Sequence, residues 1–393
     1  MANVSSSNGL EKRPKLRFPG FDEQYKQCRI GDIYAERSQR GASDMELLSV
    51  TMNDGVKPRS EIEGKDNSSE DKSNYKIVRK GDMVYNSMRM WQGANGISPC
   101  DGIVSPAYTV LMPKQEINNG YFAALFKSTK LINEFRKNSQ GMTSDTWNLK
   151  YPQIETIKVQ IPSISEQNIV SALFSVLDAR IVAQAQLVES LKKYKRGVVK
   201  AIMTKQIRFV DKNGKPYPEW SACTLQDAVD FLDGQRKPLE SADRAKRQGK
   251  YPYYGASGII DSIDDYIFDE PLILLGEDGA NIINRSSPLC FIATGKYWVN
   301  NHAHVMRPHK GQNIRFLREL LESLDYTRYN TGTAQPKLNQ EKCRTIPLSL
   351  PIYEEQCHIA DFLAALEHKC AQENEELEGI LQTKNALMQQ LFI

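Results

Sequence analysis

The sequence predicts an α/β or α+β protein in which two globular domains alternate with two long helices, arranged as an internal pseudo-twofold repeat. A chain of 393 residues is long enough for two to three domains. Charged residues make up 25% of it and hydrophobic residues 40%, which is typical of a folded chain rather than a disordered one. The internal repeat then sets the order of the parts.

The repeat is clearest at the start of each long helix. Residues 162–167, Pro-Ser-Ile-Ser-Glu-Gln, resemble residues 351–356, Pro-Ile-Tyr-Glu-Glu-Gln, and the two copies align without a gap to Met203 and Phe392. A weaker similarity lies upstream, where Leu16-Arg17-Phe18 with Tyr25, Ile30 and Asp32 resembles Ile207-Arg208-Phe209 with Trp220, Leu225 and Asp227. The predicted parts are a tail at 1–14, globular domains at 15–155 and 207–345, and long helices at 160–205 and 351–393.

Within the globular parts, apolar runs predict strands and amphipathic stretches predict short helices. Examples are strands at 75–78 and 271–275 and helices at 121–137 and 313–325. Mixed strands and helices of this kind give the α/β or α+β class.

Both long helices carry a heptad seam, because their seam positions alternate spacings of four and three. Ser163, three residues before Glu166, predicts a capping box that starts the first helix after Pro162. The seam residues are Val170, Phe174, Leu177, Ile181, Gln184, Val188, Leu191, Lys195, Val198 and Ile202 in the first copy, and Ile359, Leu363, Leu366, Cys370, Glu373, Leu377, Ile380, Lys384, Leu387 and Leu391 in the second.

The two helices have opposite charge. Residues 178–208 carry eight Lys or Arg against two acidic residues, whereas residues 353–393 carry eight Asp or Glu against two lysines. This complementarity predicts an antiparallel intramolecular coiled coil, since like pairs would repel. The alternative is two amphipathic helices packed on separate domain cores.

Polar residues in the seam predict the register of that coiled coil. A buried Lys or Glu opposite leucine is desolvated without compensation, so polar seam residues should face each other. The preferred register places Lys195 opposite Glu373 and Gln184 opposite Lys384. A competing register, shifted by one heptad, sets Lys195 against Leu366 and Lys384 against Leu177.

Motifs for several chemistries are missing. The sequence has no Gly-x-x-x-x-Gly-Lys-Ser/Thr loop and no Asn/Asp-Pro-Pro-Tyr/Phe motif, so neither a Walker-type nucleotide site nor an amino-methyltransferase site is expected. Glu63-Gly64-Lys65 after Asp54 only loosely resembles a nuclease motif and is expected to be a solvated loop. No catalytic or cofactor-binding residues are expected.

A metal site is not expected either. His302 and His304 could form a metal pair on one side of a strand, but a third ligand is missing, because His309 and Cys290 are near only in sequence. A hydrogen-bonding role for these histidines is therefore the expectation.

The compartment is expected to be the cytoplasm. Seven scattered cysteines without a CxxC spacing are typical of reduced thiols. The first fifteen residues lack an apolar core for a secretory signal, and the longest aliphatic runs are far shorter than a membrane span, so no membrane contact is expected.

Loops rich in glycine, amide and aromatic side chains are the candidate binding residues. Amides and arginine can match the donors and acceptors of base edges, and glycine lets the backbone approach phosphates. The alternative is that these glycines only make tight turns. The candidates are Asn86, Arg89, Trp91, Gln92 and Asn95 in the first half, and Tyr254, Ser257, Asn281, Lys296, Asn301, His302, Thr333, Gln335 and Lys337 in the second.

Across nearly the whole chain, these features resemble the specificity subunit of type I restriction–modification systems. The phrases that carry the resemblance occur in the family's order. They are the Pro-x-x-x-Glu-Gln entry to each helix and residues 16–19 (LRFP), 81–86 (GDMVYN), 101–108 (DGIVSPAY), 253–258 (YYGASG), 276–281 (GEDGAN), 293–298 (ATGKYW) and 332–338 (GTAQPKL).

The resemblance implies a non-catalytic DNA-binding subunit without cofactors of its own. It implies two target recognition domains that each read one half of a split double-stranded DNA site, with helices that space them and dock two methyltransferase (modification) subunits. Restriction or translocase subunits join in the full complex, and S-adenosylmethionine, ATP and magnesium belong to the partners. The first half departs from the pattern, with Ser139-Gln140-Gly141-Met142-Thr143 where the second has Gly332-Thr333-Ala334-Gln335.

Two alternatives from other classes remain. One is a coiled-coil scaffold that never touches DNA, which the polar loops disfavour. The other is a methyltransferase or nuclease with an unrecognised site, which the missing motifs disfavour.

Overall fold

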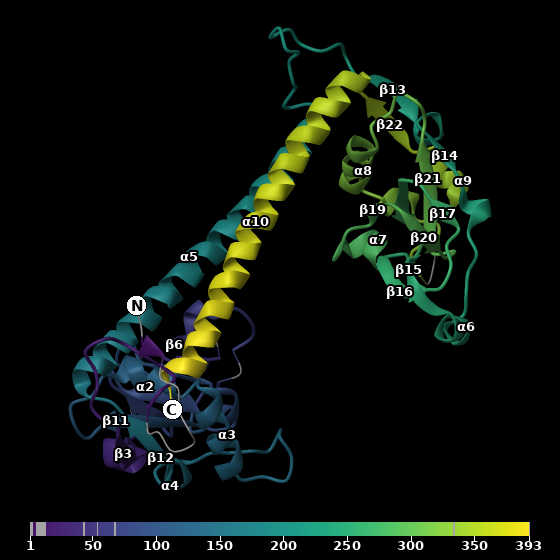
Figure 1. The fold of residues 1–393 in the computed structure, drawn as a ribbon. Coiled ribbons are helices and arrows are strands. Elements are labelled where there is room, and N and C mark those ends of the chain that lie inside the picture. Colours follow the sequence, from purple (N-terminus) through teal and green to yellow (C-terminus); the bar gives the residue numbers. More distant parts are fainter. Residues whose placement is uncertain are drawn as a thin grey trace. The chain divides into compact units, whose positions relative to one another are not determined.

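The computed structural model describes residues 3–4, 13–41, 44–52, 54–66, 68–332 and 335–392 (Figure 1). The chain forms two compact units, one of Met1–Gln186 with Glu375–Ile393 and the other of Leu187–Asn374. The first globular domain therefore packs with the beginning of the first long helix and the end of the second, and the second domain packs with the remaining helix segments.

The first unit has a four-stranded antiparallel sheet, ordered β4-β11-β8-β9, with two-stranded pairs around it. Its strands are β1 (Asn3–Val4), β2 (Leu16–Arg17), β3 (Lys26–Arg29), β4 (Tyr34–Glu36), β5 (Leu48–Thr51), β6 (Gly55–Pro58), β7 (Lys76–Val78), β8 (Met83–Asn86), β9 (Asn95–Ile97), β10 (Gly102–Val104), β11 (Tyr108–Pro113) and β12 (Lys158–Ile161). Its short helices are α1 (Ile30–Ile33), α2 (Asn119–Leu125), α3 (Thr129–Asn138) and α4 (Tyr151–Ile154), with 3₁₀ turns η1 (Arg59–Glu61) and η2 (Met90–Gln92).

The helix predicted at 121–137 is two helices, α2 and α3. Asn118 caps α2 through its side chain, and Ser128 caps α3 in the same way, accepting from the backbone N–H of Leu131. A capping side chain competes with a continuing helix, so Ser128 marks the break. Both helices bury aromatic residues, among them Phe122 and Phe135, in the core of the unit.

The second unit repeats the same sheet, ordered β14-β21-β18-β19, and adds a second sheet, β16-β15-β20-β17. Its strands are β13 (Ser221–Thr224), β14 (Val229–Phe231), β15 (Gln248–Gly255), β16 (Gly258–Ile263), β17 (Phe268–Asp269), β18 (Leu272–Gly276), β19 (Cys290–Ala293), β20 (Lys296–Val299), β21 (Ala303–Pro308) and β22 (Pro347–Leu350). Its helices are α6 (Ser241–Lys246), α7 (Asn281–Asn284), α8 (Ile314–Ser323) and α9 (Gln340–Arg344), with 3₁₀ turns η3 (Leu225–Asp227), η4 (Asp233–Gln235) and η5 (Thr327–Tyr329).

The topology confirms the duplication. In each unit the strand that leads into a long helix pairs antiparallel with the strand near the domain's start, β12 with β3 and β13 with β22. Ile30 and Leu225, which the sequence comparison aligned, are both fully buried. The carboxylates of Asp32 and Asp227, also aligned, each accept from the backbone N–H three residues upstream.

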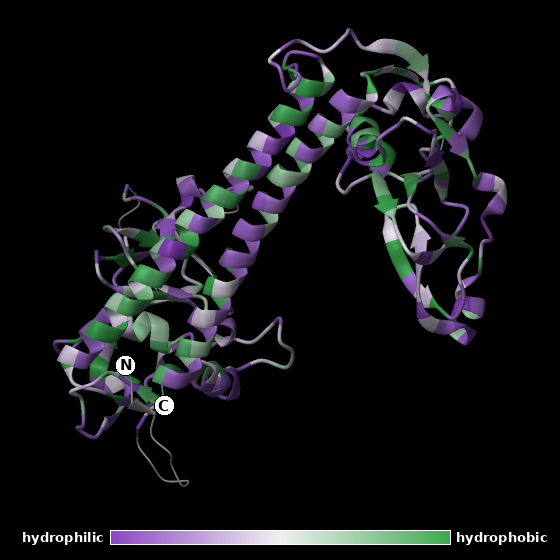
Figure 2. Cartoon of the chain, turned by 45° about the horizontal axis from the view of Figure 1, so that its top comes forward, coloured by the Kyte–Doolittle hydropathy of each residue, from purple (hydrophilic) through white to green (hydrophobic). Residues whose placement is uncertain are grey.

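The two long helices are α5 (Ile164–Met203) and α10 (Tyr353–Leu391), close to their predicted bounds. Figure 2 shows hydrophobic and hydrophilic residues alternating along both helices. In the first unit α5 and α10 are antiparallel, because Phe174 stacks on Phe392 with ring centroids 5.6 Å apart, while Arg180 pairs with Glu376 at 2.7 Å.

The preferred register of the seam is wrong. In the second unit the ammonium of Lys195 lies 3.3 Å from Glu367, not opposite Glu373, and in the first unit Lys384 pairs with Asp178 rather than Gln184. Both ion pairs fall one residue from the positions of the competing register. Each lysine side chain keeps 22% of its exposure, so its charged end reaches a carboxylate beside the seam and needs no polar partner within it.

The start of each long helix is held by a buried ion pair that the sequence analysis missed. Glu166 accepts hydrogen bonds from Arg17, at 2.9 and 2.8 Å, and from the hydroxyl of Tyr25 at 3.0 Å. The capping-box role predicted for Glu166 is therefore wrong, although α5 does start after Pro162, because both carboxylate oxygens bind residues far away in sequence.

The second unit repeats this arrangement. Arg208 donates to Glu355 at 3.0 and 3.2 Å, and the indole N–H of Trp220 donates to the same carboxylate at 3.2 Å. The following glutamine is also used alike, since Gln167 and Gln356 each accept from the backbone N–H of a helix-capping asparagine, Asn118 and Asn313. The Glu-Gln pair of the repeat motif thus fastens each helix to its own domain.

One described helix, α5, contains a window long and apolar enough to cross a membrane by length and composition alone, with a mean hydropathy of 1.3. Within the helix, however, Asp178 and Arg180 both form ion pairs with α10, as expected for a helix that pairs with another in water.

Candidate nucleic-acid interface

In the first unit, the loop after β8 meets the loop at 139–148. The backbone N–H of Leu149 donates to Ser87 at 2.8 Å, and the indoles of Trp91 and Trp147 make an edge-to-face contact with centroids 5.2 Å apart. The guanidinium of Arg136 lies 5.7 Å from the ring of Trp147. An aromatic pair flanked by a cation is a surface suited to bases and phosphates.

The structure sorts the candidates of this unit. Arg89 is exposed, and its guanidinium forms no hydrogen bond or ion pair within the described part of the chain, while Trp91 and Gln92 are half-buried. Asn86 is half-buried, and its side-chain oxygen accepts from the backbone N–H of Met88 at 3.0 Å, which shapes the turn. Asn95 is fully buried in β9 and is withdrawn as a DNA contact, because no atom of it reaches the surface.

In the second unit, the hairpin of β15 and β16 carries two candidates. Ser257 is exposed in the two-residue turn between Gly255 and Gly258. Tyr254 instead packs into the domain, stacked on Phe291 with centroids 5.7 Å apart, so its role is mainly structural.

The loops after β18 and before α9 pair with each other. The N–H of Leu338 donates to the carbonyl of Glu277 at 2.7 Å, and the N–H of Gly279 donates to Pro336 at 3.0 Å. Gln335 and Lys337 are exposed on this surface, and Lys337 lies 3.4 Å from Glu277. Thr333 lies outside the described residues.

Asn281 has an internal role. Its side-chain amide donates to the carbonyl of Ser287 at 3.0 Å and accepts from the same residue's N–H at 2.9 Å, closing the loop that follows α7. An amide satisfied in this way is not free to read a base edge, so Asn281 is withdrawn from the base-reading set.

The remaining candidates lie around β20 and β21 and are exposed. The ammonium of Lys296 lies 4.6 Å from the ring of Tyr266, and His302 makes a 2.6 Å contact with Asp278. Asn301 is exposed between them in sequence. Lys296, Asn301 and His302 therefore remain candidates for contacts with a polar ligand.

His302 and His304 do not form a pair. His304 is buried, and one ring nitrogen lies 2.7 Å from the Asp233 carboxylate while the other lies 2.9 Å from the carbonyl of Leu338. Burial lowers the pKa of His304, but hydrogen bonds to Asp233 and Cys343 outweigh it and raise the pKa to about 10. Both nitrogens thus donate as an imidazolium.

His304 also belongs to a group of residues with the composition of a metal site. Asp233, Glu277 and His304 have ligand atoms within 4.8 Å of one another. In this structure both ring nitrogens of His304 face acceptors, Asp233 and the carbonyl of Leu338, and the guanidinium of Arg236 lies 2.7 Å from Glu277. As it stands in the structure, the group forms a network of ion pairs.

The sequence analysis missed several side chains of these surfaces, namely the half-buried Trp147 and the exposed Arg136, Ile259 and Ile260. Trp147 and Arg136 were passed over because they lie outside the glycine-rich phrases that drew attention to the other loops. Ile259 and Ile260, exposed by 59% and 51% beside Ser257, resemble ordinary strand residues in sequence. A hairpin tip with two exposed isoleucines shows itself only once the strand pairing is known.

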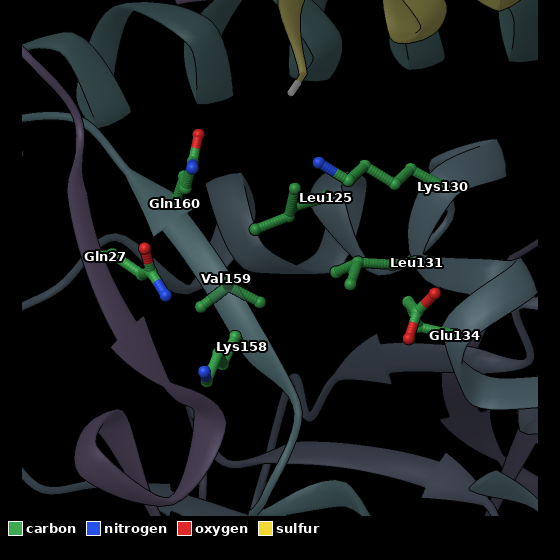
Figure 3. Close-up of a pocket in the computed structure, with 8 residues that line it drawn as sticks. All are labelled: Gln27, Leu125, Lys130, Leu131, Glu134, Lys158, Val159 and Gln160. Carbon is green, nitrogen blue, oxygen red and sulfur yellow. The ribbon is translucent and has the colours of Figure 1, made fainter. Parts of the chain in front are cut away.

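A cavity of about 160 Å³ in the first unit lies elsewhere, between β3 and β12 on one side and α2 and α3 on the other (Figure 3). Leu125, Leu131 and Val159 form its apolar part, and Lys130 and Glu134 stand at its edge. None of its lining residues belongs to the candidate set.

The family model of the type I restriction modification DNA specificity domain matches this chain twice, at residues 23–193 and at residues 217–382. The chain belongs to this family. It carries two specificity domains in tandem, and each match contains one globular domain and most of the long helix that follows.

Named relatives agree with this assignment. The type I restriction enzyme MjaVIII specificity subunit of Methanocaldococcus jannaschii is 25% identical over 348 residues, covering 80% of this chain and 79% of the relative. A protein of Haemophilus influenzae named as a type I restriction enzyme specificity subunit is 32% identical over 148 residues. That match covers 38% of this chain and only 37% of the relative's length.

Two solved structures have a fold similar to that of this chain. The S subunit of a type I restriction–modification system from M. genitalium has a TM-score of 0.59 at 15% identity, covering 97% of this chain and 99% of its own. A chain from a structure of a type I restriction–modification system has a TM-score of 0.61 at 13% identity, covering 94% and 97%.

Proposed function

We propose that this chain is the specificity subunit of a type I restriction–modification complex, in which each globular domain reads one half of a bipartite double-stranded DNA site. The observation that carries the proposal is the duplication. The family model matches twice, and both domains build the same four-stranded sheet with the same strand order. Two equivalent domains in one chain are what a split site requires.

The placement of the candidate residues supports DNA readout. In each unit two loops meet beyond the end of a central strand, β8 or β18, and present exposed polar side chains. Arg89 offers a guanidinium that can bind guanine in a bidentate way, and Lys296 and Lys337 offer charges for phosphates. Arg89 would thus contribute to base recognition, and the two lysines would contribute to attraction of the DNA backbone.

We infer that the partners supply the catalysis. The chain lacks the methyltransferase and nucleotide-binding motifs, so S-adenosylmethionine, ATP and magnesium would be bound by other subunits in the cytoplasm. Two methyltransferase subunits, one for each repeat, and restriction subunits would complete the assembly, with α5 and α10 as spacer and docking elements.

Arg89→Ala tests DNA readout by the first domain. We expect the variant to lose about 1–3 kcal/mol of discrimination at one position of the half-site read by this domain, because a bidentate contact to guanine disappears. Binding of the methyltransferase complex to cognate and single-mismatch duplexes measures the effect.

The matched control is Arg79→Ala. Arg79 is also an exposed arginine of this unit, but its guanidinium is paired with Asp101 at 2.7 Å. Its removal should leave discrimination unchanged. Lost preference of the Arg89 variant for the cognate duplex over the duplex mismatched at that one position would support the proposal. Retained discrimination at every position of this half-site would contradict it for Arg89.

A further inference from the structure

The paired loops of the second unit stand on a buried charged network. Their backbones bond through Leu338 to Glu277 and through Gly279 to Pro336, and these loops carry the candidates Gln335 and Lys337. Because the two loops are hydrogen-bonded to each other, they are positioned together by the residues on which they pack.

His304, on the central strand β21, is the group beneath. It is 1% exposed, donates to the carbonyl of Leu338 at 2.9 Å, and donates to Asp233 at 2.7 Å. Asp233 is fixed in turn, because it accepts from the N–H of Val305 at 2.8 Å and from the side chain of Gln340 at 2.9 Å. One loop is thereby tied to the sheet by a charged hydrogen bond.

Glu277 ties the other loop to the same network. Its carboxylate accepts from Arg236 at 2.7 Å and lies 3.4 Å from Lys337, and it is 3.8 Å from the ring of His304. Arg236 also donates to the carbonyl of Ala303 at 2.8 Å. Charge-assisted hydrogen bonds of this kind, shielded from water, hold geometry more firmly than neutral ones.

The first unit has a neutral pair in the corresponding place. Thr109 in β11 pairs across the sheet with Tyr85, as His304 in β21 pairs with Leu275. Its hydroxyl lies 2.8 Å from that of Ser87, the residue that accepts from Leu149. At this position of the sheet the first domain thus has two hydroxyls where the second has a histidine paired with a carboxylate.

We propose that His304, held by Asp233, is a positioning residue that sets the geometry of the two paired loops and thereby the specificity of the second domain. This inference rests on the proposed function. A buried residue would then influence which bases the second domain recognises. A displacement of about 1 Å in a supporting contact is enough to misalign a hydrogen bond between a loop side chain and a base.

His304→Gln tests the inference in the complete methyltransferase complex. Glutamine keeps a donor but cannot donate to Leu338 and Asp233 as an imidazolium does. We expect the methylated motif to relax only in the half read by the second domain, with the preference for cognate over mismatched duplexes there falling about tenfold. Long-read methylome sequencing of host DNA, with binding to mismatched duplexes, measures both halves.

Further variants separate positioning from general damage. Asp233→Asn and Gln340→Ala, which weaken the same support, should relax the same half-site, and either serves if the His304 variant does not fold. His309→Gln is the control, because His309 contacts Asp230 at the surface of the same domain. Thr109→Val should leave the half-site of the second domain unchanged.

The outcomes are distinct. A relaxed second half with an intact first half supports the inference. An unchanged motif in a folded His304 variant, or equal relaxation of both halves, overturns it. A wild-type complex that methylates no bipartite motif would instead contradict the proposed function itself.

Discussion

Glu355→Ala is expected to destabilise the second unit by about 1–3 kcal/mol, because it leaves the buried indole N–H of Trp220 without its acceptor and takes a charged partner from Arg208. The carboxylate of Glu355 is fully buried and is shared by Arg208 and Trp220. Its loss leaves the indole N–H without its acceptor and detaches the start of α10 from Arg208, which keeps Glu219 and the carbonyls of Tyr217 and Pro218 as partners. Urea unfolding followed by circular dichroism measures the change.

Glu354→Ala is the matched control. Glu354 is the preceding residue of the same helix turn and is exposed. Its removal should change stability by less than about 0.5 kcal/mol. Similar losses for the two variants would show that helix propensity or the helix dipole, and not the buried ion pair, anchors α10.

Phe392→Ala should destabilise the first unit by about 3–5 kcal/mol, as expected for deleting a buried aromatic side chain. Phe392 is 7% exposed, stacks on Phe174 and contacts Tyr121 with centroids 5.4 Å apart. The end of α10 is therefore part of the core of the first unit. Thermal unfolding of the full chain, resolved into its transitions, measures the loss.

Leu381→Ala provides the comparison. Leu381 lies on the same helix but is 40% exposed, so its truncation removes few buried contacts. We expect a loss below about 1 kcal/mol. If Phe392→Ala were as mild as this control, the packing of the C-terminal helix end on the first domain would be wrong.

The architecture was predictable from sequence because a duplication leaves a signal at every level. The heptad spacing predicted α5 and α10 close to their bounds, and the weak upstream similarity of Arg17 to Arg208 marked equivalent structural positions. What the sequence could not supply was the partner. Glu166 and Glu355 look like helix-capping residues until the tertiary structure brings Arg17 and Arg208 to them.

The register failed for a related reason. The rule that polar seam residues face each other assumes that lysine must be satisfied within the seam. Lys195 and Lys384 are long enough to reach Glu367 and Asp178 beside it. A rule that considers only seam positions cannot predict ion pairs with residues beside the seam.

The candidate loops were located by composition, but composition does not predict exposure. Asn95 lies in a buried strand, and Asn281 closes its own loop with its amide. The network of His304 could not be predicted from the sequence either. Its four members, His304, Asp233, Glu277 and Gln340, come from four separate stretches of the chain. Distances across a fold do not follow from spacing along it.

The exchange of residues 207–340 for the equivalent domain of a relative with a different specificity tests the central claim most directly. The claim is that each domain reads its own half of the DNA site. Long-read methylome sequencing of a host that carries the chimera and its methyltransferase should show one half of the methylated motif replaced and the other half unchanged. A motif changed in both halves, or in neither, would contradict independent readout by two domains.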